Sequence, residues 1–117
     1  MWAIIKFEKK KLPILKKELC IKLGSAPEFY LPTTKIQKIS KNKLNNRDFF
    51  LLGDYLLCFH DSFANKNIRE MLRYCRGVKY FLNDFIKCQI EIIEFVKKCK
   101  LNEDEQGYIK QSFFDFK

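Results

Sequence analysis

The sequence predicts an α+β fold, a layered sandwich with a mainly antiparallel four-stranded sheet and about three helices. Nearly half of its 117 residues are hydrophobic and 15% are aromatic, which is typical of one globular domain. The most apolar run, residues 51–60, holds a non-alternating piece from Tyr55 to His60. Such a run indicates a central strand buried on both faces, although periodicity alone leaves a buried helix open. Strand-length and helix-period stretches then follow one another in the order β-α-β-β-β-α-β-α.

The first elements follow from spacing. Residues 2–7 predict a strand, and Lys9–Lys11 predict a basic turn. Residues 12–23 predict an amphipathic helix, in which Pro13 is tolerated in the first turn and Gly24 marks the end. The inward face of this helix is expected to be a leucine stripe at spacings of three and four: Leu12, Leu15, Leu19 and Leu23.

Residues 28–40 predict two further strands before the central one. The stretch 28–32 is a strand ended by its proline, and the alternating stretch 33–40 is typical of an exposed edge strand. Lys41–Arg47 has the composition of a hairpin tip. Gly53-Asp54 then indicates the turn by which the chain enters the central strand.

A helix, a short strand and a second helix are expected after the central strand. Asp61-Ser62 offers a cap for a helix that extends to Cys75, and residues 78–82 predict the short strand. Residues 88–99 predict the last helix, with its inward face formed by Ile92, Val96 and Cys99.

The domain is expected to occupy residues 1–100. Residues 101–106 are acidic and predict a linker. Residues 107–117 predict a short tail whose aromatic residues have no assigned role: Tyr108, Phe113, Phe114 and Phe116.

The net charge of +9 is unevenly distributed. Residues 1–50 carry twelve Lys/Arg against four Asp/Glu, residues 51–100 carry nine against six, and residues 101–117 carry two against four. A basic half on a compact domain indicates a polyanionic partner, most simply nucleic acid. A lysine-rich solvated surface is the alternative interpretation.

Cysteine and histidine usage argues against a secreted, metal-binding or catalytic protein. The five cysteines form no C-x-x-C pair, which favours reduced, mostly buried thiols in a cytoplasmic protein over a zinc site. The one histidine, His60, ends an apolar strand, and no Ser/His/Asp or Cys/His grouping, phosphate loop or paired carboxylate stands out. No apolar run approaches the ~20 residues of a membrane-spanning helix. We therefore expect no enzyme activity, no cofactor, no small-molecule substrate and no membrane partner.

Four short motifs follow one another at fitting spacings over about residues 2–100: Trp2-Ala3-Ile4-Ile5, Glu28 to Thr33, Leu51 to Leu57, and Arg76-Gly77-Val78 with Phe81 after it. Their succession resembles the N-terminal domain of the NusG family of transcription elongation factors. Trp2-Ala3-Ile4-Ile5 looks like the opening W-Y-φ-φ strand, and Glu28 to Thr33 is similar to the strand that ends in φ-x-φ-P-x. Leu51 to Leu57 is similar to F-F-P-G-Y-φ-φ-V, with Gly-Asp in place of Pro-Gly. Arg76-Gly77-Val78, followed by Phe81, falls where the family has P-G-V or, in its RfaH branch, R-G-V.

This resemblance implies a transcription elongation or antitermination factor with a ferredoxin-like (RRM-like) sheet. Such a domain binds the clamp helices of RNA polymerase through an apolar patch, bridges the cleft over DNA and modulates pausing. The residues that map onto the patch are Leu52, Tyr55, Leu57, Phe81 and, beneath them, Trp2. Core packing is the alternative role for each, and it is favoured for Trp2 and Leu57. No KOW segment follows, so the resemblance implies a natural minimal form or an excised first domain.

The resemblance also implies that basic residues lie near non-template or upstream DNA. They would contact phosphates and read no sequence, and a solvated surface is the alternative role for each. The candidates are Lys9, Lys10, Lys41, Lys43, Arg47 and Arg76. A stand-alone nucleic-acid-binding domain with a ferredoxin-like sheet is the rival function, although the chain lacks the RNP1-type run of an RNA-recognition domain.

Overall fold

The computed structural model describes residues 1–110, apart from the side chains of residues 37–40. The protein has the predicted α+β class, with a four-stranded antiparallel sheet in the order β2-β5-β1-β6 and a separate two-stranded sheet, β3-β4. The strands are β1 (Trp2–Phe7), β2 (Glu28–Tyr30), β3 (Thr33–Ser40), β4 (Lys43–Phe50), β5 (Tyr55–Phe59) and β6 (Val78–Phe81). The α-helices are α1 (Leu12–Leu23), α2 (Lys66–Leu72) and α3 (Gln89–Leu101), and short 3₁₀ helices are η1 (Lys9–Lys11), η2 (Asp61–Ala64) and η3 (Asn83–Ile86).

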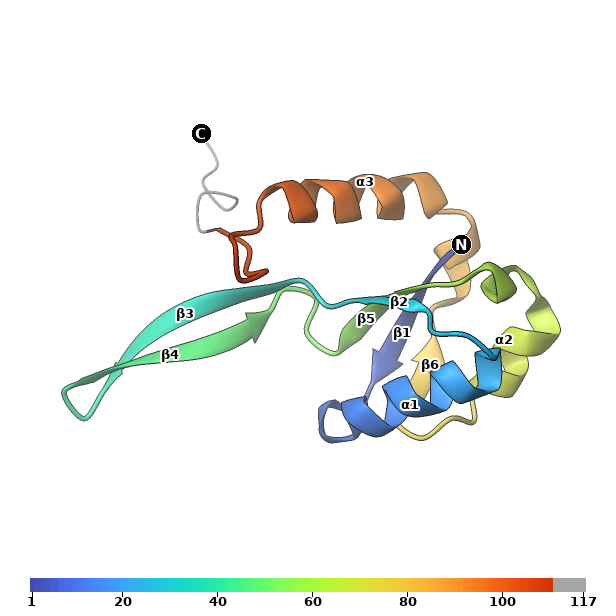
Figure 1. Cartoon of the computed structure of the whole chain (residues 1–117), viewed down its shortest axis with the longest axis horizontal. Helices are drawn as coiled ribbons and strands as arrows, with labels where there is room; N and C mark the ends of the chain where they lie inside the picture. The colour runs from blue at the N-terminus through green and yellow to red at the C-terminus, as the bar shows by residue number, and fades with distance from the viewer. Residues whose placement is uncertain (111–117) are drawn as a thin grey trace.

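The four-stranded sheet lies between α1 and α3, as Figure 1 shows. Consecutive residues of β5, Leu56, Leu57 and Cys58, are all buried, as the non-alternating run predicts for a strand covered on both faces. The helix faces are also as predicted, since Leu15 and Leu19 of α1 are fully buried and α3 turns Ile92, Val96 and Cys99 inward.

Strands β3 and β4 form a ribbon that projects from the body and gives the molecule its longest dimension, 51 Å (Figure 1). Eight residue pairs join the two strands, and the connection is only Lys41-Asn42, both with positive φ. A two-residue turn of this kind matches the twist of the strands on either side. The predicted tip Lys41–Arg47 is therefore wrong beyond Asn42, because Lys43–Arg47 belongs to β4. Residues 33–40 form an edge strand, as predicted, but in the separate two-stranded sheet with β4; among its described side chains Ile36 is exposed and Thr34 is buried.

The helix predicted from Asp61 to Cys75 is interrupted. The chain forms η2 first and α2 afterwards, and neither begins at an Asp61-Ser62 cap. His60 Nδ1 accepts the backbone N–H of Ser62 at 3.0 Å, and Asn65 Oδ1 accepts that of Asn67 at 2.9 Å. These side chains satisfy donors that a helix start leaves open, so each short helix has its own cap.

Residues 102–110 pack against the root of the ribbon, so the predicted linker and the start of the tail are part of the fold. The backbone N–H of Ile109 donates to Thr33 O at 2.8 Å, and the buried hydroxyl of Thr34 donates to Ile109 O at 2.8 Å. Ile109 itself is buried. Three tail residues, Phe113, Phe114 and Phe116, lie outside the described residues.

Over residues 1–110, no helix combines the length and the apolarity needed to cross a membrane. The five cysteines are free thiols, of which Cys58, Cys75 and Cys99 are buried. Burial raises the pKa of the Cys99 thiol to about 11, and it raises the pKa of Cys58 and Cys75 as well.

Candidate protein-binding and nucleic-acid-binding surfaces

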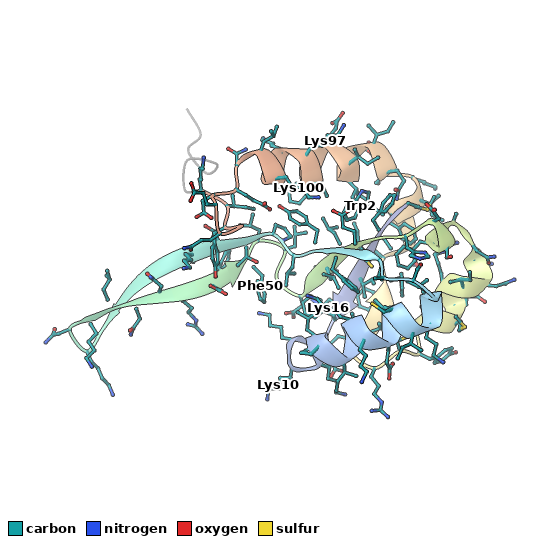
Figure 2. All side chains as sticks on the ribbon, viewed as in Figure 1. Trp2, Lys10, Lys16, Phe50, Lys97 and Lys100 are labelled. Atoms are coloured by element: carbon teal, nitrogen blue, oxygen red, sulfur yellow. The ribbon has the colours of Figure 1, made fainter. Side chains whose placement is uncertain are left out.

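Two of the five residues expected to contact RNA polymerase lie in the core. Trp2 is 6% exposed and packs edge-to-face on Phe59, with ring centroids 5.3 Å apart. Figure 2 shows Trp2 under α3. Leu57 is 2% exposed. Both residues therefore pack in the core, the alternative role predicted for them, and they are too buried to contact a partner.

Phe81 does not join Tyr55, because it lies on the opposite face of the sheet. In the antiparallel register Phe81 is paired with Ile5, whereas Tyr55 is paired with Lys6. Neighbouring residues of a strand point to opposite faces, and paired residues share one. The Phe81 ring packs edge-to-face on buried Phe63, at 6.0 Å between centroids.

The exposed aromatic residue of β6 is Tyr80, which the sequence analysis missed. Lys6 is paired with both Tyr55 and Tyr80, so these three side chains form a row across β5, β1 and β6 on one face. We call this row the tyrosine patch. The two phenol oxygens lie 3.2 Å apart, and Lys6 Nζ lies 4.5 Å from the centroid of the Tyr55 ring. Tyr80 is 46% exposed and Tyr55 is half-buried.

Helix α3 covers only the other end of this sheet face. Gln89, the first residue of α3, hydrogen-bonds both the N–H and the carbonyl of Trp2, which shares the face with Lys6. Lys100, at the C-terminal end of α3, donates to Glu28 at 2.6 Å (Lys100 is labelled in Figure 2). The tyrosine patch therefore remains accessible beside the helix.

The turn that precedes β5 flanks the tyrosine patch. Leu52, also expected in the polymerase contact, is half-buried in this turn, and its carbonyl accepts the N–H of Tyr55 at 3.2 Å. Asp54 is 3.6 Å from Lys6 Nζ and 3.5 Å from Lys9 Nζ. The aspartate thereby links the patch to the basic turn η1.

The hydrogen bond between the two phenols has an electrostatic consequence. It raises the pKa of Tyr80 above its ordinary value. The Tyr80 hydroxyl therefore stays neutral at physiological pH and can donate to or accept from a partner.

The structure brings together two predicted DNA-contacting residues that are far apart in the chain. Lys9 and Arg47 line one open groove of about 620 Å³ between η1 and the root of the ribbon. The groove also contains aromatic residues, of which Phe50 lies 5.6 Å from Lys9 Nζ (ring centroid) and is labelled in Figure 2. The sequence analysis treated Phe49-Phe50 only as an approach to the central strand.

Lys10 and Arg76 lie near the same end of the sheet. Lys10 is exposed in η1, next to Lys9 (Figure 2). Glu8, just before η1, donates its N–H to Gly77 O at 2.9 Å, which places Arg76 beside this turn. Arg76 is largely exposed, and its Nε lies 3.6 Å from Glu18 Oε1 on α1.

Lys41 and Lys43 lie at the far end of the ribbon, away from the groove. Every described side chain from Lys41 to Phe49 is exposed. The candidate DNA-contacting residues thus form two groups, one around η1 with Arg47 and Arg76, and one at the ribbon tip.

The described part of the chain contains no cluster of three or more His, Cys, Asp or Glu side chains able to hold a metal ion. His60 caps η2, and its Nε2 lies 2.7 Å from Ser25 Oγ. Among the described residues, no carboxylate is hydrogen-bonded to His60 or Ser25, so this pair lacks the third group that orients a catalytic base.

No protein-family model matches the chain, and no curated protein sequence matches it.

Proposed function

We propose that this domain is a transcription elongation or antitermination factor of the NusG type, which acts in the cytoplasm and modulates pausing. It binds the clamp-helix coiled coil of RNA polymerase through the tyrosine patch, with its basic residues toward DNA. The observation that supports this proposal best is the row Lys6, Tyr55 and Tyr80 on the part of the sheet face that α3 leaves uncovered. The motifs described above place Tyr55 in the family's contact region.

The chemistry of the patch suits a helical partner. Tyrosine rings supply apolar contact area with few rotatable bonds, and their hydroxyl groups remain satisfied at the rim of an interface. Lys6 already lies over the Tyr55 ring and is held there by its ion pair with Asp54. Little side-chain entropy is therefore lost when an acidic residue of the partner pairs with Lys6. We therefore expect the two tyrosines to supply most of the binding energy.

The basic turn η1 adjoins the tyrosine patch, which supports the proposal that basic residues face DNA. Asp54 joins Lys6 to Lys9, and Lys10 follows Lys9 in η1. The carbonyl of Gly77, next to Arg76, accepts the N–H of Glu8 just before η1. A polymerase bound at the tyrosine patch would leave these cations free to contact nearby phosphates. Such contacts add affinity for DNA without sequence preference.

A pulldown with an isolated clamp-helix coiled coil tests the proposal. Tyr55→Ala and Tyr80→Ala should each weaken binding about 30-fold, the effect of losing a hot-spot residue. Tyr74→Ala is the matched control, because Tyr74 is 83% exposed near the C-terminal end of α2 and belongs to neither the patch nor the groove. Circular dichroism should show that all three variants are folded. Unchanged binding by both patch variants would reject the polymerase contact.

The ribbon favours one rival function, a nucleic-acid-binding domain that acts without polymerase. An isolated two-stranded hairpin is marginally stable in water, and this one exposes cations along its length. If this is the main function, affinity for DNA or RNA alone should be strong and should fall steeply with salt. Combined Lys41→Gln and Lys43→Gln changes should then lower both affinity and salt dependence. Weak binding to nucleic acid alone would reject this function.

A further inference from the structure

The groove at the ribbon root combines an exposed aromatic ring with two cations. Phe49 is 49% exposed, and Ile36 beside it is 41% exposed. In the β3-β4 register Phe49 is paired with Thr34, and Arg47 with Ile36. Alternation places the side chains of Ile36, Arg47 and Phe49 on one face of the ribbon. Exposed apolar groups in a concave site indicate a ligand with an apolar face.

The cations approach the groove from two separate elements. Arg47 comes from β4, and Lys9 comes from η1 on the body of the protein. Lys9 pairs with Asp54, but Asp54 also pairs with Lys6 and cannot neutralise both lysines. The groove is therefore bordered by net positive charge on both sides.

Among the described residues that line the groove the one acid is Asp48, and its strand partner lies on the other face of the ribbon. Its partner in the register is Lys35, on the other face of the ribbon from Arg47 and Phe49. On that face Lys35 Nζ also lies 4.5 Å from the centroid of the Tyr108 ring. Asp48 thus opposes an anion in the groove less than its position in the sequence suggests.

We infer that this groove binds one unpaired nucleotide of a single-stranded nucleic acid, with its base stacked on Phe49 and its phosphate held between Lys9 and Arg47. Cationic grooves with an accessible aromatic ring are the usual solution for single strands, because every base has a π-face. A base inside a duplex is already stacked on both sides and cannot use Phe49. A volume of about 620 Å³ lies within the range of small-molecule sites.

This inference rests on the proposed function only in its choice of nucleic acid as the partner, and it names the form that is bound. In the proposed function, exposed cations contact only the DNA phosphates, whether the DNA is single-stranded or double-stranded. The groove adds a contact to the base itself, which requires an unpaired strand. The same chemistry would accept deoxyribonucleotides or ribonucleotides.

Fluorescence anisotropy with the full chain tests the inference. The probes are labelled oligo(dT) and oligo(rU) of about fifteen nucleotides and a mixed-sequence duplex of the same length. The single strands should bind more tightly than the duplex. Phe49→Ala should weaken single-strand binding about 5- to 150-fold, and Phe49→Trp should retain it. A preference between the dT and rU probes would identify the natural strand as DNA or RNA.

Two further variants make the assignment specific. Arg47→Gln should weaken binding and reduce the slope of log affinity against log salt by about 0.7, the value for one phosphate contact on a single strand. Leu44→Ala is the matched control, because Leu44 is 64% exposed on the same strand but on its other face. This control should bind as the wild type does.

The outcomes distinguish this inference from the polymerase proposal. Phe49→Ala should bind the clamp-helix coiled coil normally, and Tyr55→Ala should bind oligo(dT) normally. Wild-type affinity of Phe49→Ala for both single strands would overturn the inference, whatever the coiled-coil result. So would equal losses for Phe49→Ala and Leu44→Ala, since these would show a general effect on the ribbon.

Discussion

Gly77, the glycine of the R-G-V motif, is predicted to be required by packing. It joins α2 to β6 with φ of +87°, a conformation that L-residues rarely adopt. A Cβ built on it would lie 3.1 Å from the Cβ atoms of Leu15 and Lys11 and 3.1 Å from Lys11 O. A side chain at this position would thus require the start of α1 to move by a few tenths of an ångström.

Two terms make up the expected cost of Gly77→Ala. The positive φ costs an L-residue about 1–2 kcal/mol. The overpacking costs about 1–3 kcal/mol, because Leu15 is fully buried and the Lys11 carbonyl is backbone, so neither can move aside easily. The sum, about 2–5 kcal/mol, is a large fraction of the ~5–15 kcal/mol of a typical domain.

Urea and thermal unfolding measure this cost, and Gly53→Ala is its matched control. Gly53 has φ of +62°, but a Cβ there would meet nothing within 4 Å, so only the backbone term of about 1–2 kcal/mol remains. We expect Gly77→Ala to lower the midpoint temperature by about 4 °C more for each extra kcal/mol. If the two variants lose the same stability, the close approach of α1 does not constrain the motif.

Two further predictions concern the other end of the sheet. Gln89→Ala should cost about 2–3 kcal/mol in urea unfolding, because the Gln89 amide bonds Trp2 N and Trp2 O at 2.8 and 2.7 Å and also Phe85 O; a loss under about 0.5 kcal/mol would contradict this role. For Tyr30, burial and a hydrogen bond donated to Glu103 at 2.6 Å raise the pKa above its ordinary value of 10.0. The folded state therefore retains this proton when the unfolded state loses it, and stability that is fully present below pH 10 should fall as the pH rises further. Tyr30→Phe should flatten this alkaline decline in unfolding experiments, and an unchanged decline would show that Tyr30 does not cause it.

Local periodicity predicted the elements whose burial is decided by their own sequence. The leucine stripe of α1 and the inward residues of α3 were correct because one helix face packs against the sheet. The burial of residues 56–58 was predicted correctly, because a strand that is covered on both faces shows no alternation of apolar and polar residues. In each case the spacing of apolar residues along the chain directly indicates which side chains are buried.

The ribbon was only partly predictable, because pairing outweighs composition there. Asn45 and Asn46 are residue types that favour turns. They nevertheless lie in β4, because residues 33–40 pair with this strand along its whole length. Only the two residues of the actual turn, Lys41 and Asn42, adopt positive φ.

The candidate sites depended on register, which a single sequence specifies poorly. Phe81 was chosen over Tyr80, and the choice between the two faces of β6 is made by its pairing with β1, where the register shifts between Lys6 and Phe7. The meeting of Lys9 with Arg47 likewise follows from where the ribbon leaves the sheet, and no spacing in the sequence encodes it.

Asp54 provides a structural link between the two proposed surfaces. Its carboxylate interacts with Lys6, which lies over Tyr55, and with Lys9, which borders the groove. A phosphate that binds Lys9 withdraws this lysine from Asp54 and leaves the aspartate to Lys6 alone. A firmer pair between Lys6 and Asp54 changes how Lys6 is presented at the tyrosine patch. If phosphate binding in the groove changes the affinity of the tyrosine patch for its partner, thermodynamic reciprocity requires that this partner change the affinity of the groove for phosphate by the same factor.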